Sequence, residues 1–405
     1  MAEEILAGKR IVLGVTGGIA AYKCAELVRE MVRARAEVTV VMTDNAKQFI
    51  TPLTFQVLSG QPVFTDMFKQ DFYDINHISL SEKADLMVIA PATANIIGKI
   101  AAGIADDLLT TTVLAMTSPV LICPAMNGRM YLNPVVQENI NRLQQRGYLF
   151  VPPGYGELAC GTEGEGRLAD LGAILEGVKG ALTPKDFTGE RVLVTAGPTR
   201  EPIDPVRFIS NHSTGKMGYA IAQVAARRGG EVILISGPTH LNPPYGVKVV
   251  KVGTAREMRD AVMGYRNWAT VVIKAAAVAD YRPQTTADQK IKKTQKALTL
   301  KLERNPDILA EVAKDKGNKV VVGFAMETEE LLARAQEKLK RKNLDLICAN
   351  DLTEPGAGFA VDTNLICLID KSGKAERLPL MGKEQVASII LDRVREILNA
   401  RCGRL

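Results

Sequence analysis

Three side chains in the first half of the chain have the chemistry of acids, bases or thiols at conspicuous positions. They are His77, Asn127 within the octet Pro124–Tyr131, and Cys160 within a glycine-rich stretch. An imidazole changes its charge near neutral pH, and the pKa of a thiol is close enough to neutrality for it to act as a proton donor. Taken singly, such residues are more often a hydrogen-bonded structural histidine, a turn residue and an inert thiol.

A glycine-rich turn and a small-residue loop predict a ligand site in the same half. Gly14–Ala20 follows an apolar run and opens a helical segment. It has neither the G-x-G-x-x-G spacing of a dinucleotide site nor a Walker pattern. Its N–H groups and helix dipole suit one phosphate, although a plain strand-to-helix turn is an equal alternative. Thr43 could help to hold that phosphate, and the small residues of Pro91–Asn95 would let a flat ring approach the backbone.

The second half carries a different polar loop. Thr195–Asp204 follows an apolar run, and Arg207–Gly218 leads into a segment with a helical pattern. Hydroxyl side chains, glycines and a lysine stand where that helix is expected to begin. Such a helix N-terminus suits anionic oxygens. It is not a Walker loop, because Met217 stands where Ser or Thr is required. An ordinary polar loop of an α/β domain is the alternative.

Short apolar runs alternate with helix-like segments throughout the chain. Most runs are continuous, as expected of parallel strands covered on both faces, so we predict an α/β fold with mainly parallel sheets. The runs in the first half are Arg10–Val15, Glu37–Met42, Asp85–Ala90, Pro119–Cys123 and Tyr148–Val151. The runs in the second half are Arg191–Ala196, Glu231–Ser236, Thr270–Ala276, Lys319–Ala325, Leu344–Ala349 and Leu365–Asp370.

The two halves open alike, each with a strand, a glycine turn, an amphipathic helix and a second strand. We therefore predict two Rossmann-like domains, residues 1–185 and 186–405, which agrees with a length of 405 residues. Gly172–Glu190 has the polar, turn-forming composition of a linker.

Composition narrows the class of protein. No apolar run is long enough to span a bilayer, and no secretory signal is visible, which predicts a cytoplasmic protein without a membrane partner. Six cysteines without C-x-x-C spacing indicate reduced, buried thiols, and three scattered histidines make a zinc site improbable.

The net charge of +6 is concentrated partly in two basic runs, Lys290–Lys293 and Lys338–Lys342. Such runs are most often solvated faces, and the functional alternatives are polyphosphate or nucleic-acid binding. Aromatic residues make up 5% of the chain and do not interleave with these runs, which disfavours a nucleic-acid surface.

Five motifs of the first half occur in a specific order: Gly17–Lys23, Asn76–Ile78, Ala90–Asn95, Pro124–Asn127 and Ala159–Gly161. Together they resemble the flavin-containing cysteine decarboxylases, in particular phosphopantothenoylcysteine decarboxylase. The resemblance implies trimeric packing with FMN at subunit contacts, an active-site histidine at His77, a carboxylate-binding asparagine at Asn127 and a catalytic cysteine at Cys160. It implies FMN binding by Gly17, Gly18, Ile19, Thr43, Thr93, Ala94, Asn95 and Ala125.

The chemistry of that family fits these residue types. An α-amido carboxylate has no electron sink, and oxidation of the neighbouring thiol to a thioaldehyde supplies one. Cys160 could then donate a proton to carbon, and His77 could position or deprotonate the substrate thiol. Gly154–Gly166 has the composition of a mobile lid around the cysteine. One departure is Arg33–Ala36, where the family often has a glycine, and it puts the geometry of that helix end in doubt.

The second half resembles phosphopantothenate–cysteine ligase, fused behind the decarboxylase as in bacterial bifunctional proteins. The motifs are Arg207–Gly218, Ala275–Arg282, Asn305–Ile308, Gly323–Ala325 and the two basic runs. The resemblance implies an acyl-cytidylate made from phosphopantothenate and CTP, which cysteine then attacks, with Mg²⁺ carried by CTP. Asn211 would contact the acyl intermediate, and Lys290 would support its formation. The implied nucleotide site is Ala275, Ala276, Asp280, Lys290, Asn305, Pro306, Asp307, Ile308, Phe324, Lys338 and Lys342.

The resemblance further implies a homo-oligomer with dimeric ligase units beside the trimeric decarboxylase units, up to a dodecamer. It gives no metal ligands. Two other classes of protein stay open: a nicotinamide-dependent oxidoreductase with tandem Rossmann domains, and a nucleic-acid-binding or scaffold protein that uses its basic runs. Missing G-x-G-x-x-G spacing speaks against the first, and the scarcity of aromatics against the second.

Overall fold

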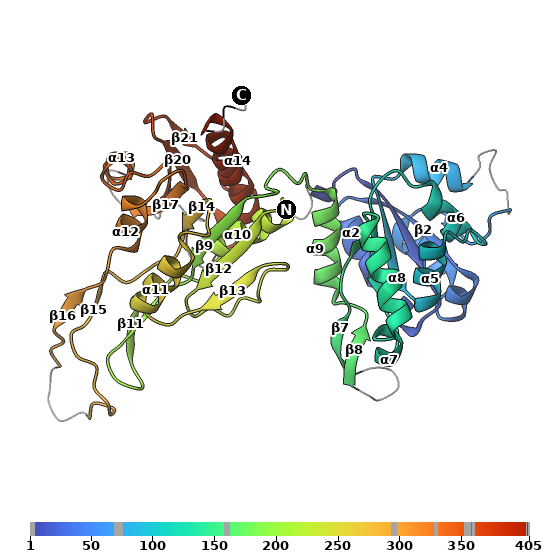
Figure 1. Ribbon diagram of the computed structural model, residues 1–405, viewed down its shortest axis with the longest axis horizontal. Coiled ribbons are helices and arrows are strands. Elements are labelled where there is room, and N and C mark those ends of the chain that lie inside the picture. Colours follow the sequence, from blue (N-terminus) through green and yellow to red (C-terminus); the bar gives the residue numbers. More distant parts are fainter. Residues whose placement is uncertain are drawn as a thin grey trace. The chain divides into compact units, whose positions relative to one another are not determined.

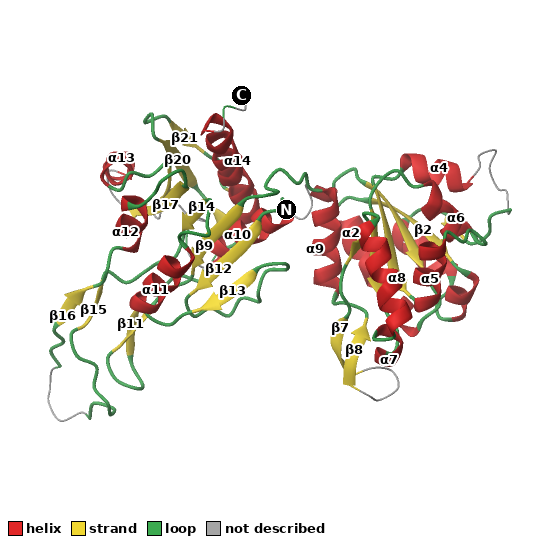
Figure 2. Ribbon diagram, in the orientation of Figure 1, coloured by secondary structure: helices red, strands yellow, loops and turns green. Residues whose placement is uncertain are grey.

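The computed structural model describes residues 5–68, 76–157, 163–292, 298–327, 331–351, 358, 361–401 and 403. Internal contacts divide the chain into unit 1, Met1–Thr183, and unit 2, Pro184–Leu405, so the division falls two residues before the predicted boundary. Each unit has a central sheet with helices on its faces (Figures 1 and 2). No helix in the described ranges is long and apolar enough to cross a membrane.

Unit 1 contains a six-stranded sheet in the order β3-β2-β1-β4-β5-β6, and every neighbouring pair is parallel. Its direction of winding reverses between β1 and β4. This is the topological switch point, beside which ligands bind in open α/β sheets. The strands are β1 (Arg10–Val15), β2 (Glu37–Met42), β3 (Val63–Phe64), β4 (Leu86–Ala92), β5 (Val120–Pro124) and β6 (Leu149–Phe150).

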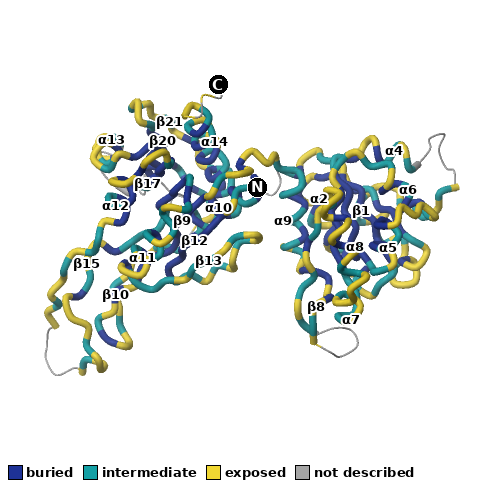
Figure 3. The backbone as a smooth tube through the Cα atoms, in the orientation of Figure 1, coloured by how far each residue is buried: buried dark blue, intermediate teal, exposed yellow. Residues whose placement is uncertain are grey.

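Helices cover both faces of this sheet and create two cores. Leu13 and Val15 of β1 pack into one core with α2, whereas Val12 packs into the other with α5 and α6. Burial on both sides explains why the strands are continuous apolar runs, and they form the dark interior of Figure 3. The helical elements are η1 (Ile19–Tyr22), α2 (Lys23–Arg33), η2 (Asp44–Gln48), α3 (Pro52–Ser59), α4 (Asn76–Lys83), α5 (Ala94–Ala102), α6 (Leu108–Ala115), α7 (Gly128–Tyr131), α8 (Pro134–Gln145) and α9 (Leu171–Leu182).

The predicted linker Gly172–Glu190 is wrong over most of its length, because Leu171–Leu182 forms helix α9. Ile174 and Val178 of this helix are buried in the core of unit 1. The composition of the segment indicated a turn, but Gly177 lies within the helix, where the absence of a side chain lets α9 pack closely against the sheet. A Cβ at Gly177 would lie 2.6 Å from Val151 Cγ2, so a larger residue would push the helix away from the sheet.

The helix end that lacks the family glycine keeps a left-handed cap without it. Arg35 has φ +63°, and its N–H donates to Val32 O at 2.9 Å, while the Ala36 N–H donates to Met31 O at 3.0 Å. A non-glycine residue in this conformation costs roughly 1 kcal/mol. The capping hydrogen bonds and the start of β2 hold the turn in place.

Unit 2 contains an eight-stranded sheet in the order β13-β12-β9-β14-β17-β18-β20-β21. The first six strands are parallel neighbours, and the winding reverses between β9 and β14, which gives a second switch point. The strands are β9 (Arg191–Ala196), β12 (Glu231–Ser236), β13 (Lys248–Lys251), β14 (Val271–Lys274), β17 (Val320–Glu327), β18 (Leu346–Asp351), β20 (Ile366–Asp370) and β21 (Ala375–Arg377).

The last predicted run, Leu365–Asp370, differs from the parallel pattern. It forms β20, which pairs antiparallel with β18 and with β21. A short turn joins β20 to β21, and such a turn permits only antiparallel pairing. The run is continuous because β20 contributes to the cores on both faces of the sheet, so an apolar run reports burial and not strand direction.

Helices α10 (Lys216–Arg227) and α14 (Lys383–Arg401) cover one face of this sheet. Helices α11 (Ala255–Tyr265), α12 (Ile308–Lys314) and α13 (Leu331–Arg341) cover the other. Figure 1 shows two antiparallel hairpins that extend from unit 2 beyond its sheet. They are β10 (Arg200–Pro202) with β11 (Phe208–Ser210), and β15 (Tyr281–Pro283) with β16 (Leu302–Arg304). A further small pair is β19 (Thr363–Asn364) with β22 (Met381–Gly382).

Candidate active sites

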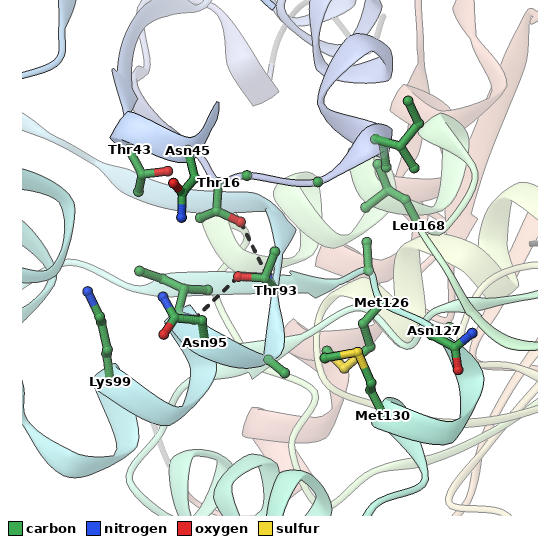
Figure 4. Close-up of a pocket in the computed structure, with 18 of the residues that line it drawn as sticks. Thr16, Thr43, Asn45, Thr93, Asn95, Lys99, Met126, Asn127, Met130 and Leu168 are labelled. Carbon is green, nitrogen blue, oxygen red and sulfur yellow. Dashed lines mark hydrogen bonds between the residues drawn. The ribbon is translucent and has the colours of Figure 1, made fainter. Parts of the chain in front are cut away.

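A cavity of about 1270 Å³ lies at the carboxyl ends of β1, β2, β4 and β5, beside the switch point of unit 1. Sites for single drug-sized ligands span roughly 300–1,000 Å³, so this cavity has room for a planar cofactor and part of a second molecule. Figure 4 shows Thr43 and Asn45 on one side of it and Asn127, Met130 and Leu168 on the other. All the predicted FMN-binding residues line it, namely Gly17, Gly18, Ile19, Thr43, Thr93, Ala94, Asn95 and Ala125.

The glycine turn approaches the loop after β2 so closely that no side chain fits between them. A Cβ at Gly17 would lie 2.4 Å from Asn45 Cβ and 2.9 Å from the Asn45 carbonyl carbon. This contact places the turn and η1 beside Thr43 at the cavity wall. The buried hydroxyl of Thr43 has no hydrogen-bond partner within the described part of the chain. A buried donor without a partner is what a phosphate bound at this turn would satisfy.

Thr16 and Thr93 tie the loop after β1 to the loop after β4. The Thr16 hydroxyl donates to Pro91 O at 2.6 Å and accepts from the Thr93 N–H at 3.2 Å. Thr93 in turn caps the N-terminus of α5, because its hydroxyl accepts from the Ile96 N–H at 3.4 Å (Figure 4). Ala94 and Asn95 are thereby fixed at the cavity wall, where small side chains leave the backbone accessible to a flat ring.

Asn127 is held beside this cavity by a hairpin formed of β7 (Gly154–Glu157) and β8 (Glu163–Arg167). The Met126 N–H donates to Gly166 O at 2.8 Å. Gly166 has φ +127°, and a Cβ there would lie 2.3 Å from Met126 O, so only glycine permits this contact. The Asn127 side-chain oxygen accepts from the Arg129 N–H at 2.9 Å, which fixes this side chain at the start of α7, where Asn127 lines the cavity.

Cys160 lies in the segment 158–162, outside the described residues. The strands on both sides of that segment, β7 and β8, pair as a hairpin. Gly166 and Arg167, the last residues of β8, line the cavity. The described part of the segment predicted as a lid contacts the Asn127 loop through Gly166.

Charged residues that sequence reasoning missed also line the cavity. Lys99 Nζ contacts Asp106 Oδ1 at 2.8 Å, and this hydrogen bond raises the pKa of Lys99. Burial, followed by the charge of Arg167, lowers the pKa of Lys23. Lys99 lies one helical turn after the predicted Asn95, a spacing that places both on one face of α5 and could have identified it.

His77 is not among the residues that line this cavity. It lies in the first turn of α4, which packs against α6, and its side chain is partly buried. Within one copy of unit 1 the structure therefore brings together the predicted FMN residues and Asn127, but not His77.

The second site is built on the loop after β14, at the switch point of unit 2. The Ala277 N–H donates to Gly197 O at 3.0 Å, and the Ala276 N–H donates to the Thr195 hydroxyl at 3.2 Å. Asn211 reaches this loop through its amide nitrogen, which donates to Ala277 O at 2.9 Å. This contact brings Asn211 to the loop that also carries Ala275 and Ala276.

Asn305 holds the other end of the same loop. Its side-chain nitrogen donates to Ala279 O and its backbone N–H donates to Asp280 O, both at 2.8 Å. Pro306 follows, and Asp307 caps α12 by accepting from the Ala310 N–H at 3.0 Å. The predicted residues Asp280, Asn305, Pro306, Asp307 and Ile308 thus form one connected group.

Two lysines of the second basic run point into this group instead of into solvent. Lys338 Nζ donates to Phe324 O at 2.8 Å, and Lys342 forms an ion pair with Asp307. Burial lowers the pKa of Lys342, and the charge of Asp280 opposes this effect. Lys340 lies between them in sequence and is exposed. The solvated-face interpretation therefore holds for only part of the run.

Lys290 is exposed and lies on the connection between β15 and β16. The connection is anchored by Asp204, whose buried carboxylate accepts from the Ile291 N–H at 3.1 Å and binds the Arg207 guanidinium. Arg207 and the backbone N–H groups hold the pKa of Asp204 well below its usual range. Among the described residues, no hydrogen bond or ion pair joins Lys290 to Asn211 or Asn305.

Comparisons with known families match the two halves separately. The Flavoprotein family matches residues 2–183, and the family called DNA/pantothenate metabolism flavoprotein C-terminal domain matches residues 187–398. Over nearly its whole length, the chain is 49% identical to the Coenzyme A biosynthesis bifunctional protein CoaBC of Vibrio cholerae, across 97% of this chain and 99% of that protein. The proteins of the same name from Bacillus subtilis and Escherichia coli are each 48% identical, across 96% of this chain and 97% of their own lengths.

Solved structures are similar to each half. The crystal structure of the C-terminal domain of a CoaBC protein is 43% identical and covers 53% of this chain and 99% of its own, with a TM-score of 0.47. A mutant PPC decarboxylase complexed with pantothenoylaminoethenethiol is 32% identical and covers 42% of this chain and 97% of its own, with a TM-score of 0.39.

Proposed function

We propose a two-step reaction for this chain from the premise that it belongs to the family of coenzyme A biosynthesis bifunctional proteins. Unit 2 is a phosphopantothenate–cysteine ligase, which joins cysteine to phosphopantothenate at the expense of CTP. Unit 1 is a phosphopantothenoylcysteine decarboxylase, which converts the product to phosphopantetheine. The observation that carries the proposal is that the predicted FMN residues and Asn127 lie at the switch point of unit 1, and that Asn211 and Asn305 hold the loop at the switch point of unit 2.

The FMN site of unit 1 is supported by the shape and hydrogen bonding of the cavity. The turn at Gly17 and Gly18, with the Thr43 hydroxyl, would hold the phosphate. The ring would lie along Thr93–Asn95 and Ala125, where small side chains expose the backbone. When bound, FMN supplies the two-electron oxidation of the substrate thiol and returns the electrons after carbon dioxide has left.

Asn127 would bind the carboxylate that departs, because it lines the cavity and a side-chain amide can donate a hydrogen bond to a carboxylate. His77 would position or deprotonate the substrate thiol, and Cys160 would donate a proton to the carbon that lost carbon dioxide. The hairpin that carries Cys160 contacts the Asn127 loop at Gly166, which supports a common site for the two residues.

Replacing Cys160 tests its role as proton donor. We expect Cys160→Ser to slow formation of phosphopantetheine by roughly 10²–10⁴-fold, because a hydroxyl is a far weaker acid than a thiol. The enethiol product of decarboxylation should accumulate, since carbon dioxide release precedes the protonation. The measurement is carbon dioxide and phosphopantetheine from supplied phosphopantothenoylcysteine. A normal rate of phosphopantetheine formation would show that Cys160 is not the donor.

In unit 2, the phosphopantothenate carboxylate attacks the α-phosphorus of CTP, which releases pyrophosphate and forms an acyl-cytidylate. The amine of cysteine then attacks the acyl carbon, and CMP leaves. Both steps concentrate negative charge, so ammonium groups and N–H donors aimed at the phosphates lower the barrier. Asn211 would contact the acyl intermediate, Lys290 would support its formation, and Lys338 and Lys342 would bind the phosphates. Mg²⁺ would arrive with CTP, held mainly by the phosphates.

A homo-oligomer is proposed because each site lacks one assigned residue within a single copy. His77 lies off the cavity of unit 1, and Lys290 lies on an exposed connection of unit 2. A second copy that supplied His77 would place the flavin at a subunit contact, as expected for trimeric decarboxylase units; dimeric ligase units would complete the assembly.

Mixed oligomers test this arrangement. We expect His77→Ala and Asn127→Ala chains to be inactive as decarboxylases when produced separately. Co-produced, they should recover part of the activity, because a chain with an intact His77 can complete the cavity of a chain with an intact Asn127. The measurement is carbon dioxide release by the mixed preparation. Absence of recovery in a preparation proven to contain mixed oligomers would place His77 in the cavity of its own chain.

The function is tested by incubating the full chain with phosphopantothenate, cysteine, CTP and Mg²⁺ while following pyrophosphate and carbon dioxide. We expect pyrophosphate to appear first and carbon dioxide to follow, with phosphopantetheine as product. Omission of cysteine should abolish carbon dioxide release, whereas supplied phosphopantothenoylcysteine should restore it without CTP. Failure to release carbon dioxide from supplied phosphopantothenoylcysteine by the flavin-loaded protein would contradict the assignment of unit 1.

A further inference from the structure

Thr239, on the loop after β12, contacts two other segments of unit 2 through its methyl group. A Cβ added at Gly197 would lie 2.9 Å from Thr239 Cγ2, and a Cβ added at Gly215 would lie 2.8 Å from the same atom. Ordinary contacts between carbon atoms are about 3.5–4.0 Å long. The methyl group therefore fills the space between the loop after β9 and the start of α10, and it excludes a side chain at both glycines.

A chain of three hydroxyl groups holds this methyl group in place. The Thr239 hydroxyl donates to the Tyr219 hydroxyl at 3.1 Å, and the Ser236 hydroxyl donates to Gly237 O at 2.8 Å. The Tyr219 and Ser236 oxygens are 3.0 Å apart. Because the single proton of Ser236 is directed at Gly237, it is Tyr219 that donates to Ser236. The chain ties the loop after β12 to α10, and a fixed Thr239 hydroxyl also fixes the direction of the methyl group on the same carbon.

The two segments that Thr239 separates both lead to Asn211. Gly197 O accepts from the Ala277 N–H at 3.0 Å, and Ala277 O accepts from the Asn211 amide nitrogen at 2.9 Å. On the other side, Gly215 is the N-cap of α10 and follows Asn211 by four residues. A change in the spacing of Gly197 and Gly215 would therefore displace Asn211 relative to the loop after β14.

We propose that Thr239 is a positioning residue of the ligase site: its methyl group sets the distance between Gly197 and Gly215 and, through them, the place of Asn211. The inference rests on the proposed ligase function of unit 2 and extends it to a residue that the family resemblance leaves out. Misplacement of a reacting group by about 1 Å can cost on the order of 10²-fold in rate. Loss of this one methyl group is therefore expected to affect turnover far more than stability.

Two substitutions separate the methyl group from the hydroxyl group. Thr239→Ser removes the methyl group and keeps the hydroxyl, whereas Thr239→Val keeps a methyl group toward the glycines and removes the hydroxyl. We expect the kcat of ligation to fall by about 10- to 100-fold in Thr239→Ser and by less than about 3-fold in Thr239→Val. The KM for CTP should stay nearly unchanged in both variants, because Asn211 is assigned to the acyl intermediate and its displacement affects turnover more than binding.

Thermal unfolding shows whether the loss of turnover is merely structural. Each variant loses one small contribution, either packing or a hydrogen bond, so both should unfold about 2–4 °C below the unsubstituted protein. A fall in kcat that is confined to Thr239→Ser, while both variants lose similar stability, is not what a structural role would produce. Thr188→Ser is the matched control, because it removes the same methyl group from an exposed threonine before the amino end of β9. It should change neither quantity.

The assay follows pyrophosphate release by the full chain with phosphopantothenate, cysteine, CTP and Mg²⁺. Decarboxylation of supplied phosphopantothenoylcysteine serves as an internal reference that the three variants should leave unaltered. Normal turnover by Thr239→Ser would overturn the inference, and so would an equal fall in kcat in Thr239→Ser and Thr239→Val or a loss of folding in either variant. If the unsubstituted protein releases no pyrophosphate, the ligase function itself has failed.

Discussion

Gly17→Ala is expected to yield a colourless protein that makes phosphopantothenoylcysteine but no longer decarboxylates it. The added methyl group would lie 2.4 Å from Asn45 Cβ and 2.9 Å from the Asn45 carbonyl carbon, so the turn must move. Movement of the turn would misdirect the N–H groups that are proposed to hold the FMN phosphate. Each charge-assisted hydrogen bond is worth about 1.5–3 kcal/mol, so FMN affinity should fall by about 100-fold or more.

The measurement is FMN affinity by fluorescence quenching, together with both activities. Gly172→Ala is the matched control, because it adds the same methyl group to unit 1 at a helical position with nothing within 4 Å. We expect this control to keep its flavin and its decarboxylase activity. Normal FMN binding by Gly17→Ala would mean that the phosphate does not sit at this turn.

Asn211→Asp should abolish ligation while leaving decarboxylation of supplied phosphopantothenoylcysteine intact. The Asn211 amide nitrogen donates to Ala277 O at 2.9 Å, and an aspartate would face that carbonyl oxygen with a carboxylate. The substitution removes the donor, places a carboxylate against the Ala277 carbonyl oxygen and adds negative charge beside the proposed site of the phosphates. Loss of one preorganised donor alone costs on the order of 10²–10³ in rate, and we expect at least that loss in pyrophosphate release.

Asn318→Asp serves as control for the same change of charge. Asn318 is exposed and lies just before the amino end of β17. The site lies at the carboxyl ends of the strands, on the opposite side of the sheet. Pyrophosphate release by this variant should be close to normal. Equal damage by Asn211→Asp to ligation and to decarboxylation would argue against two separable sites.

Much of the fold could be predicted because burial on both faces leaves a clear signal in the sequence. The runs Arg10–Val15, Glu37–Met42, Arg191–Ala196 and Glu231–Ser236 coincide with β1, β2, β9 and β12 at both ends. Motifs that follow such strands converge because parallel strands end at one edge, which is why the predicted FMN residues share a cavity.

The errors arose where one sequence pattern has two physical causes. Glycines mark flexible connections, but Gly177 is small because α9 packs closely on the sheet. A continuous apolar run marks burial, but β20 shows that it does not fix strand direction. Basic runs mark solvated faces, yet α13 turns Lys338 and Lys342 inward and Lys340 outward.

Other features depend on contacts between segments that are distant in sequence. Thr239 stands in an ordinary loop, and nothing in its neighbours shows that its methyl group packs between Gly197 and Gly215. Likewise, the separation of His77 from the cavity follows from the packing of α4 on α6, which no local motif encodes.

The most direct measurement is the amount of flavin that the purified full chain holds. Protein produced in cells should be yellow, and denaturation should release one FMN for each chain, since the proposed site at the turn of Gly17, Thr43 and Thr93–Asn95 would hold the cofactor without a covalent bond. A folded protein that is colourless and takes up no FMN when the cofactor is supplied would contradict the account of unit 1.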